Sequence, residues 1–494
     1  MKLKLILTTV AIVACVYTSN AQYAGDALRF SQTLAGSSAR FKGIGNAQTA
    51  FGGDISSLGA NPAGLGFFTK SDLGLTLEYN NYTSMARYLN FNSNGTRDAL
   101  NINQAGAVFH IPTYRPKGSD LEKGWISFDF GLGYNRNADF GNMVVYSGTN
   151  PSNSIADYFA ELATKNFGSP NTLSLGSLER MAYDDYLIGY DSNGDYYFPE
   201  TDVNNVQTKT EERRGGQSQF NMAFAGNYSN KLYLGLNLGF ARINYISESN
   251  FNEKGYNVTE ASNYQTTYLQ DQDTKGRGFN AKLGLIYRPI PNIRLGASYE
   301  TPTWYTIDDS YTEVLKTKHV KAGLGNTNNP ENYSFTYRLR TPSKLSLGLG
   351  IILGDFGLLS ADMDAIDYSK INFRSIDNND LGIIYDNNSD VIDNYKKAYN
   401  YRIGAEFKLD QIMIRGGYGI QGNPYKNLDD KQFQTKTLSG GLGYRHKNYY
   451  FDITYQQNSF NSDLKPYQLA DNSGPRAFVE TTRNNVFTTF GIKF

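Results

Sequence analysis

Residues 125–135 read WISFDFGLGYN, and this stretch decides the fold. Large apolar side chains such as Ile126, Phe128 and Phe130 alternate with small or polar ones. Successive side chains of a β-strand point to opposite faces, so this strand would have one apolar and one polar face. A run of about ten residues with this alternation has the length and period of a tilted membrane-spanning strand.

Similar runs recur from Asp72 to the end of the chain, and about fourteen can be counted. The eighth contains Pro342, and we interpret it as one kinked strand or as two short ones. Short turns alternate with long polar segments, which is typical of an outer-membrane barrel with its long loops outside. The fold class predicted is all-β, an antiparallel transmembrane β-barrel of about fourteen strands over residues 72–494. The long segments are 136–216 (the longest), 246–276, 305–330, 367–397, 422–434 and 460–483.

The composition fits this class and excludes others. The 494 residues include 49 Gly, 38 Tyr and 29 Phe but only 14 Pro, and the mean hydropathy is −0.49. A barrel is hydrophilic on average because half of each strand faces the lumen. The formal net charge is zero, which gives no electrostatic reason to expect nucleic acid as a partner. Three histidines at scattered positions support no metal site, and no cofactor is predicted.

The two ends of the chain carry features of an exported barrel. Residues 1–21 are predicted to be a signal peptide, with Lys2 and Lys4 before an apolar run and a small-residue cleavage site before Gln22. Cys15 lies within this segment, and the segment also loosely resembles a lipoprotein signal in which Cys15 would be acylated. A small apolar residue inside the signal peptide is the favoured interpretation of Cys15. The final strand ends on Phe494, which resembles the C-terminal signal that the barrel-assembly machinery recognises.

Residues 36–68, GSSARFKGIGNAQTAFGGDISSLGANPAGLGFF, are rich in Gly and Ala and too poor in large apolar side chains to form a core alone. Asn61-Pro62 predicts a helix start, because Asn caps free N–H groups and Pro has none to lose. About fourteen strands make a barrel too wide to fill with its own side chains. We therefore expect residues 22–71 to be a hatch that plugs the lumen.

This segment resembles the N-terminal hatch of the FadL/TodX outer-membrane transporters, which carry long-chain fatty acids and other hydrophobic molecules. Late runs such as Tyr401–Phe407 and Ile414–Tyr418 are also similar to that family. The resemblance implies an exported, monomeric channel of a Gram-negative outer membrane, embedded in its lipid and gated by the hatch. The residues it implies for hatch and gating are Arg40, Gly45, Ala47, Asp54, Asn61, Pro62, Ala63 and Gly64.

Two further sets of residues are candidates for ligand contact. The alternation of side chains places three arginines on the lumen face: Arg294, Arg402 and Arg415. One of them could receive a ligand carboxylate. The favoured interpretation is that such charges tie the hatch to the wall through ion pairs. In segment 136–216 an amphipathic helix is predicted from Ser154 to Phe167, with a weaker one near Met181. An exposed apolar face could capture ligand at the outer loops, or the two helices could simply pack together. The capture candidates are Ile155, Tyr158, Phe159 and Leu162.

The sequence thus predicts a non-enzymatic channel for passive uptake of hydrophobic small molecules such as long-chain fatty acids. A general porin for polar solutes is one alternative. An outer-membrane lipid hydrolase is a weaker one, which would need a pair such as a serine with His110. Asp191–Asp195 resembles a calcium loop, but its glycine is misplaced and an Asn/Gly turn is the better interpretation.

Overall fold

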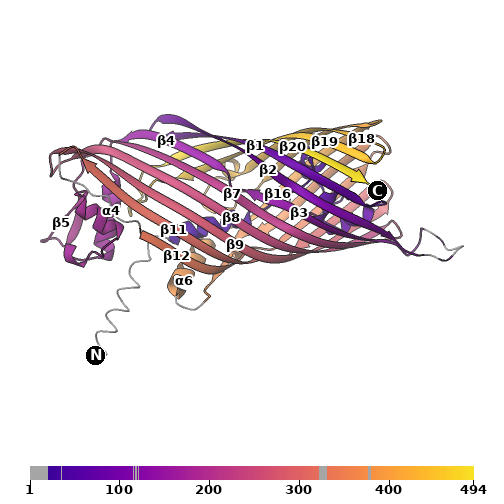
Figure 1. Ribbon diagram of the computed structural model, residues 1–494, viewed down its shortest axis with the longest axis horizontal. Helices are drawn as coiled ribbons and strands as arrows, with labels where there is room; N and C mark the ends of the chain where they lie inside the picture. The colour runs from indigo at the N-terminus through magenta and orange to yellow at the C-terminus, as the bar shows by residue number, and fades with distance from the viewer. Residues whose placement is uncertain are drawn as a thin grey trace, which may run out of the picture.

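The computed structural model describes residues 20–34, 36–114, 116, 120, 122–321, 331–376 and 380–494. Most of the predicted signal peptide, with Cys15, lies outside the described residues. The chain forms an elongated antiparallel β-barrel with outer helices at one end and the C-terminus at the other (Figure 1). The barrel is closed, because the first strand pairs with the last from Asp72↔Lys493 to Tyr88↔Ala477. Closure leaves no sheet edge exposed to lipid.

Eighteen strand segments make up the barrel sheet, and they occupy fourteen positions because four positions each contain two consecutive segments. These split positions are β3–β4, β10–β11, β12–β13 and β14–β15. The segments are β1 (Asp72–Tyr88), β2 (Phe91–Pro112), β3 (Trp125–Asp139), β4 (Asn142–Asn150), β7 (Asn205–Tyr228), β8 (Leu232–Asn257), β9 (Ser262–Ile290), β10 (Ile293–Glu300), β11 (Trp304–His319), β12 (Glu331–Arg340), β13 (Lys344–Ile352), β14 (Gly357–Asp367), β15 (Asn372–Arg374), β16 (Lys397–Leu409), β17 (Ile412–Gln421), β18 (Thr435–His446), β19 (Tyr449–Leu464) and β20 (Ala477–Lys493).

The prediction of a barrel with one greasy and one polar face is confirmed. On β3, Phe128 points outward and is 47% exposed, whereas Ser127 and Asp129 are buried toward the lumen. The same alternation gives the other strands an outward belt of Leu, Ile, Phe and Tyr. In a membrane this belt faces acyl chains, so its exposure in the isolated chain is expected.

The strands on one side of the barrel are longer than the sequence suggested. β8 and β9 have 26 and 29 residues and pair from Leu232↔Tyr287 to Asn257↔Ser262. The predictions of long loops at 246–276 and 305–330 are therefore wrong, apart from the residues between strands. Beyond the belt the outward face meets water, while the inward face carries buried residues such as Phe251, Tyr264 and Leu315. These parts therefore lack the alternation of outward apolar and inward polar residues that marks a membrane strand.

Pro342 lies between β12 and β13, so this run forms two short strand segments, the alternative to one kinked strand. The neighbouring position breaks at the same level, between β10 and β11, at Pro302. The amide of Thr341 donates to the carbonyl of Thr303 at 3.1 Å, which ties the two breaks together. Proline cannot donate to a ladder, and here two prolines create one local interruption of the wall.

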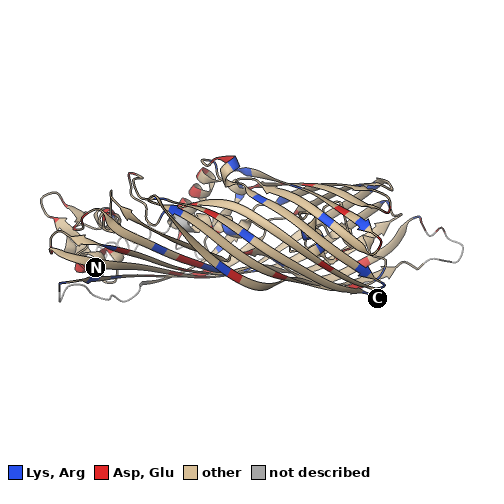
Figure 2. Ribbon diagram, turned by 90° about the horizontal axis from the view of Figure 1, so that it is seen from above, with Lys and Arg blue, Asp and Glu red and all other residues tan. Residues whose placement is uncertain are grey.

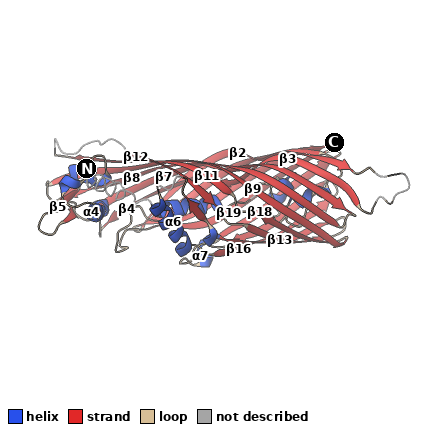
Figure 3. Cartoon of the chain, turned by 90° about the horizontal axis from the view of Figure 1, so that it is seen from below, coloured by secondary structure: helices blue, strands red, loops and turns tan. Residues whose placement is uncertain are grey.

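Helical segments at the N-terminus lie inside the ring of strands (Figure 3). We call residues 22–71 the hatch. Its segments are the helix α2 (Asn20–Ser31), which begins just before it, the helix α3 (Ala39–Gly43) and the 3₁₀ turns η2 (Ile55–Leu58) and η3 (Pro62–Phe67). The remaining helices are α4 (Ile155–Asn166), η4 (Pro170–Thr172), α5 (Leu178–Asp184), η5 (Tyr368–Lys370), α6 (Leu381–Asn394) and α7 (Asp430–Phe433), and β5 (Ile188–Asp191) pairs with β6 (Tyr196–Pro199).

Candidate functional site

The turn η3 begins where Asn61-Pro62 predicted a helix. The Asn61 side chain accepts a hydrogen bond from the amide of Ala63, and Pro62 occupies the first helical position. The Asn61 amide group also donates to the carbonyl of Thr49 at 2.7 Å and to carbonyls of β9 and β10 at 3.3 Å. One side chain therefore starts the turn, closes the hatch on itself and fixes it to the wall.

Asp54 organises the other half of the hatch. Its carboxylate accepts hydrogen bonds from the amide and hydroxyl of Ser56 at 2.9 and 2.7 Å and from the hydroxyl of Ser38 at 2.9 Å. It thereby caps η2 and joins it to the start of α3. Because all these groups are buried, their polar atoms need such partners.

Glycines of the wall give the hatch room to approach. A Cβ atom at Gly235, Gly284 or Gly417 would come within 3.0 Å of hatch atoms, at Ala63, Asn61 and Gly45 respectively. Gly45 itself has φ +66°, a conformation that other residues adopt with difficulty. The hatch candidates Ala47, Ala63 and Gly64 are buried at the same contact. Backbone thus packs against backbone where larger side chains would not fit.

Two of the three lumen arginines that were candidates for a ligand carboxylate are already paired. Arg415 contacts Glu406 at 2.6 Å and Asp452 at 2.7 Å. Arg40 of the hatch reaches the same Glu406 through two hydrogen bonds of 2.9 Å. Charged positions lie within the strands as well as at their ends (Figure 2). This network supports our favoured interpretation, in which lumen charges tie the hatch to the wall.

Arg402 holds Asp364 through two hydrogen bonds of 2.6 and 2.8 Å. The adjacent Asp362 accepts from the amides of Gln48 and Thr49 at 2.8 and 2.9 Å. Arg402 and Arg415 are both buried and have carboxylates of the protein as partners. The geometry leaves Arg294 as the member of this set without a carboxylate partner among the described residues.

Within the hatch, the helix α2 lies in the lumen with two different faces. One face packs Tyr23, Ala27 and Phe30 against aromatic and aliphatic residues of the wall and of α6. Among the wall residues are Tyr245, Tyr337 and Phe373. The other face turns Gly25, Asp26 and Arg29 toward polar cavities of about 290 and about 260 Å³. An apolar surface and an ionic surface therefore meet along one helix inside the barrel.

The second of these cavities contains a lysine that sequence reasoning missed. Lys209 of β7 is 7% exposed and lines the cavity beside Arg213 and Glu211. Arg213 is paired with Glu211, whereas Lys209 has no hydrogen bond or ion pair within the described part of the chain. Lys209 lies outside the lipid-facing belt, since Phe220 is the last aromatic residue of that belt on β7. Burial lowers the pKa of the Lys209 ammonium. The polar residues Asn205, Gln207 and Lys209 show no sustained alternation with large apolar side chains, so the sequence carries no clear signal for this part of β7.

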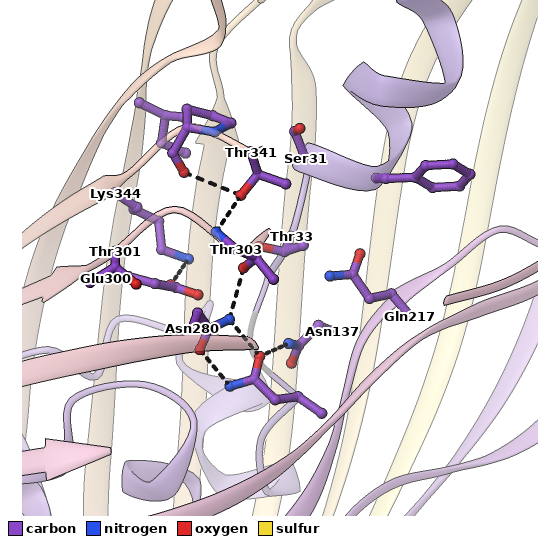
Figure 4. Close-up of a pocket in the computed structure, with 14 residues that line it drawn as sticks. Ser31, Thr33, Asn137, Gln217, Asn280, Glu300, Thr301, Thr303, Thr341 and Lys344 are labelled. Carbon is purple, nitrogen blue, oxygen red and sulfur yellow. Dashed lines mark hydrogen bonds and ion pairs between the residues drawn. The ribbon is translucent and has the colours of Figure 1, made fainter. Parts of the chain in front are cut away.

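Below α2 the lumen narrows to a polar cavity of about 20 Å³ (Figure 4). Asn280 donates to the hydroxyl of Thr303 at 2.8 Å, and Lys344 pairs with Glu300 at 3.0 Å. Such a cavity has room for about one water molecule. The cavity lies at the level of the two strand breaks, since Thr303, Thr341 and Pro342 line it.

The outer helices are where the sequence placed them. Ser154 and Asp157 form a complete capping box at the start of α4, and α5 covers the second predicted helix. The expectation of an exposed apolar face is wrong for Ile155 and Phe159, which are fully buried against α5 and the extended strands. Tyr158 and Leu162 are partly buried at the same cluster. The two helices bury each other's apolar faces because they fold back over β8 and β9, which a single helix pattern cannot reveal.

The structure gives little support to the other chemistry that was weighed. The His110 ring lies 2.7 Å from Asp129, and the Ser127 hydroxyl is bonded to Asp129 rather than to the ring. Asp191–Asp195 forms the turn between β5 and β6. Within the described ranges no group of three His, Cys, Asp or Glu residues could hold a metal ion. No helix in the described part of the chain is long and apolar enough to cross a membrane.

These observations define the class: an antiparallel fourteen-position transmembrane barrel whose lumen is plugged by its own N-terminal segment. No protein-family model and no curated protein matches the sequence. The fold is that of known channels for hydrophobic compounds.

A FadL homologue of Pseudomonas aeruginosa is similar with a TM-score of 0.56 and 15% identity, over 94% of this chain and 99% of that one. The P. putida toluene transporter TodX is similar with a TM-score of 0.53 and 12% identity, over 94% and 99%. The resemblance noted for the hatch is thus confirmed at the level of the fold.

Proposed function

We propose that this protein mediates passive uptake across an outer membrane of hydrophobic molecules with an ionised head, such as long-chain fatty acids. The observation that carries this proposal is the pairing of surfaces along α2. The cavity of about 260 Å³ offers the unpaired ammonium of Lys209, and an apolar cluster packs on the opposite face of the same helix. A carboxylate beside Lys209 and an acyl chain displacing part of that cluster would satisfy both.

The hatch is proposed to be the gate. Its contacts with the wall include hydrogen bonds and ion pairs, such as Arg40 with Glu406, which can exchange for bonds to water. Outside α2, the apolar contacts between hatch and wall form small separate clusters rather than one large core. The helix α2 of the hatch, which lines the narrow polar cavity, would have to move before a ligand could pass. Ligand would then leave when the hatch or one of the wall breaks rearranges, down its own gradient.

Replacing Lys209 tests this proposal. In K209M, the affinity of the purified protein for palmitate should fall about tenfold or more, because a charge-assisted hydrogen bond contributes about 1.5–3 kcal/mol. Affinity for hexadecan-1-ol, which has the same chain and no charge, should change less than about twofold. K275M is the matched control, since Lys275 is exposed and pairs with Asp273.

In cells that rely on this protein for palmitate uptake, K209M should lower the uptake and K275M should not. Equal loss of acid and alcohol binding in K209M would contradict a head-group role for Lys209. Absence of palmitate uptake by the unmodified protein would contradict the proposed function itself.

A further inference from the structure

At the end of the barrel opposite the outer helices, two arginines face the lumen without a carboxylate. Arg288 is near the end of β9 and Arg294 is near the start of β10, on either side of the turn at Pro291. Both are half-buried, and each has a buried Nε atom without a hydrogen-bond partner. Neither forms an ion pair with a described residue, in contrast to Arg402 and Arg415.

The surroundings of Arg294 are aromatic and positive. Its guanidinium lies 4.4 Å from the ring centroid of Phe67 and 5.3 Å from that of Phe51, both in the hatch. Phe67 stacks on Tyr233 at 3.8 Å, and the Tyr233 hydroxyl accepts a hydrogen bond from Arg288 at 3.4 Å. Arg288 and Arg40 add positive charge near Arg294, and no ion pair with a carboxylate of the described residues offsets it.

We infer that Arg288 and Arg294 form an oxyanion site on the inner face of the hatch, which receives the ionised head of the ligand as it leaves. Guanidinium groups bind carboxylate and phosphate through fixed pairs of N–H donors. The Phe51 and Phe67 rings hold Arg294 beside the hatch, and Phe67, which is only partly buried, offers an apolar surface for the adjoining chain. The identity of the head group rests on the proposed function, but the oxyanion chemistry rests on the two arginines.

The test is protection of these arginines from chemical modification. The purified full-length protein is treated with p-hydroxyphenylglyoxal, which modifies guanidinium groups, and labelled peptides are quantified by mass spectrometry. Laurate should slow the labelling of Arg288 and Arg294 about tenfold, whereas dodecan-1-ol should not. Arg402, buried in its ion pairs, should stay unlabelled throughout, and the exposed Arg338 should label equally in every sample.

Inorganic phosphate is the second probe. Protection by phosphate as strong as that by laurate would support the oxyanion site and assign it a soluble anion as its source. Protection by laurate alone supports the head of an amphiphile. No protection by either, or equal protection by dodecan-1-ol, overturns the site.

Two variants separate binding from hatch stability. R294Q removes contacts with the hatch. Among the described residues Arg288 bonds to Tyr233 and the backbone of Pro291, so R288Q leaves the hatch contacts in place. R288Q should lower laurate protection of Arg294 at least about threefold, and full protection in R288Q contradicts a shared site. If the unmodified protein shows protection but no uptake of laurate by cells, the proposed function fails and the site stands.

Discussion

At the scale of the residue, the hatch is held by a few buried polar side chains with several bonds each. Asn61 is the clearest case, since it caps η3 and also reaches the carbonyl of Thr49 and the wall. A buried polar group that loses its partner costs more than an exposed one, because no water replaces the bond.

N61A is therefore expected to weaken hatch docking by about 2 kcal/mol, because the cap and the buried hydrogen bonds are lost. Hydrogen exchange of residues 39–67 in the folded barrel measures it. N92A, at an exposed asparagine of β2, is the control and should have no effect. Unchanged exchange in N61A would show that other contacts determine docking.

Lys42 makes docking depend on pH. It is buried beside the ring of Phe487, and burial lowers its pKa from the ordinary 10.5 to about 8. Between these two values the docked lysine is neutral and a released one is protonated, so the released hatch binds more protons. Docking should therefore become stronger as the pH rises from about 8 to 10.5, and K42M should abolish that rise. A flat profile in the unmodified protein, measured by the same exchange, would contradict the shift.

At the scale of the element, the wall strands position the hatch at their glycines, where the absence of a side chain leaves space for it. Gly235 and Gly284 on neighbouring strands leave the space that Pro62 and Asn61 occupy. The alternation that forms a lipid-facing belt also determines which glycines face inward.

G235A is expected to displace η3 and raise permeability to small sugars, because the new methyl group would overlap Ala63 and Pro62. Liposome swelling measures this. G416A is the matched control, since a Cβ atom at Gly416 on β17 meets nothing within 4 Å. Swelling rates equal in the two variants would show that the hatch can yield at this point without opening the lumen.

At the scale of the whole molecule, the hatch, including its helix α2, lies inside the barrel. The cavities beside α2 have volumes of about 260 and about 290 Å³, whereas the cavity below has about 20 Å³. A general porin needs a continuous aqueous path, whereas the lumen of this barrel is plugged by its own N-terminal segment.

The unmodified protein should therefore give no more liposome swelling with glucose than protein-free liposomes, and a variant lacking residues 39–68 should swell rapidly. A porin in the same liposomes supplies the upper reference. Rapid swelling with the unmodified protein would favour the porin alternative over the proposed uptake of hydrophobic acids.

Much of the barrel could be predicted because its cause is local. The alternation in residues 125–135, the cap at Asn61-Pro62 and the capping box at Ser154 and Asp157 each depend on residues close together in the chain. The extended parts of β8, β9 and β11 could not, since their outward face is polar and their inward face packs on distant helices, which reverses the pattern of a membrane strand.

The sequence alone determined that a closed barrel forms and that small residues precede it, because both follow from the spacing of side-chain types along the chain. Only the tertiary structure decided which charges are free. Arg402 and Arg415 have carboxylates from neighbouring strands as partners, whereas Arg288, Arg294 and Lys209 have none among the described residues. Pairing depends on strand register and on how the hatch lies in the lumen, and a pattern read along one strand contains neither.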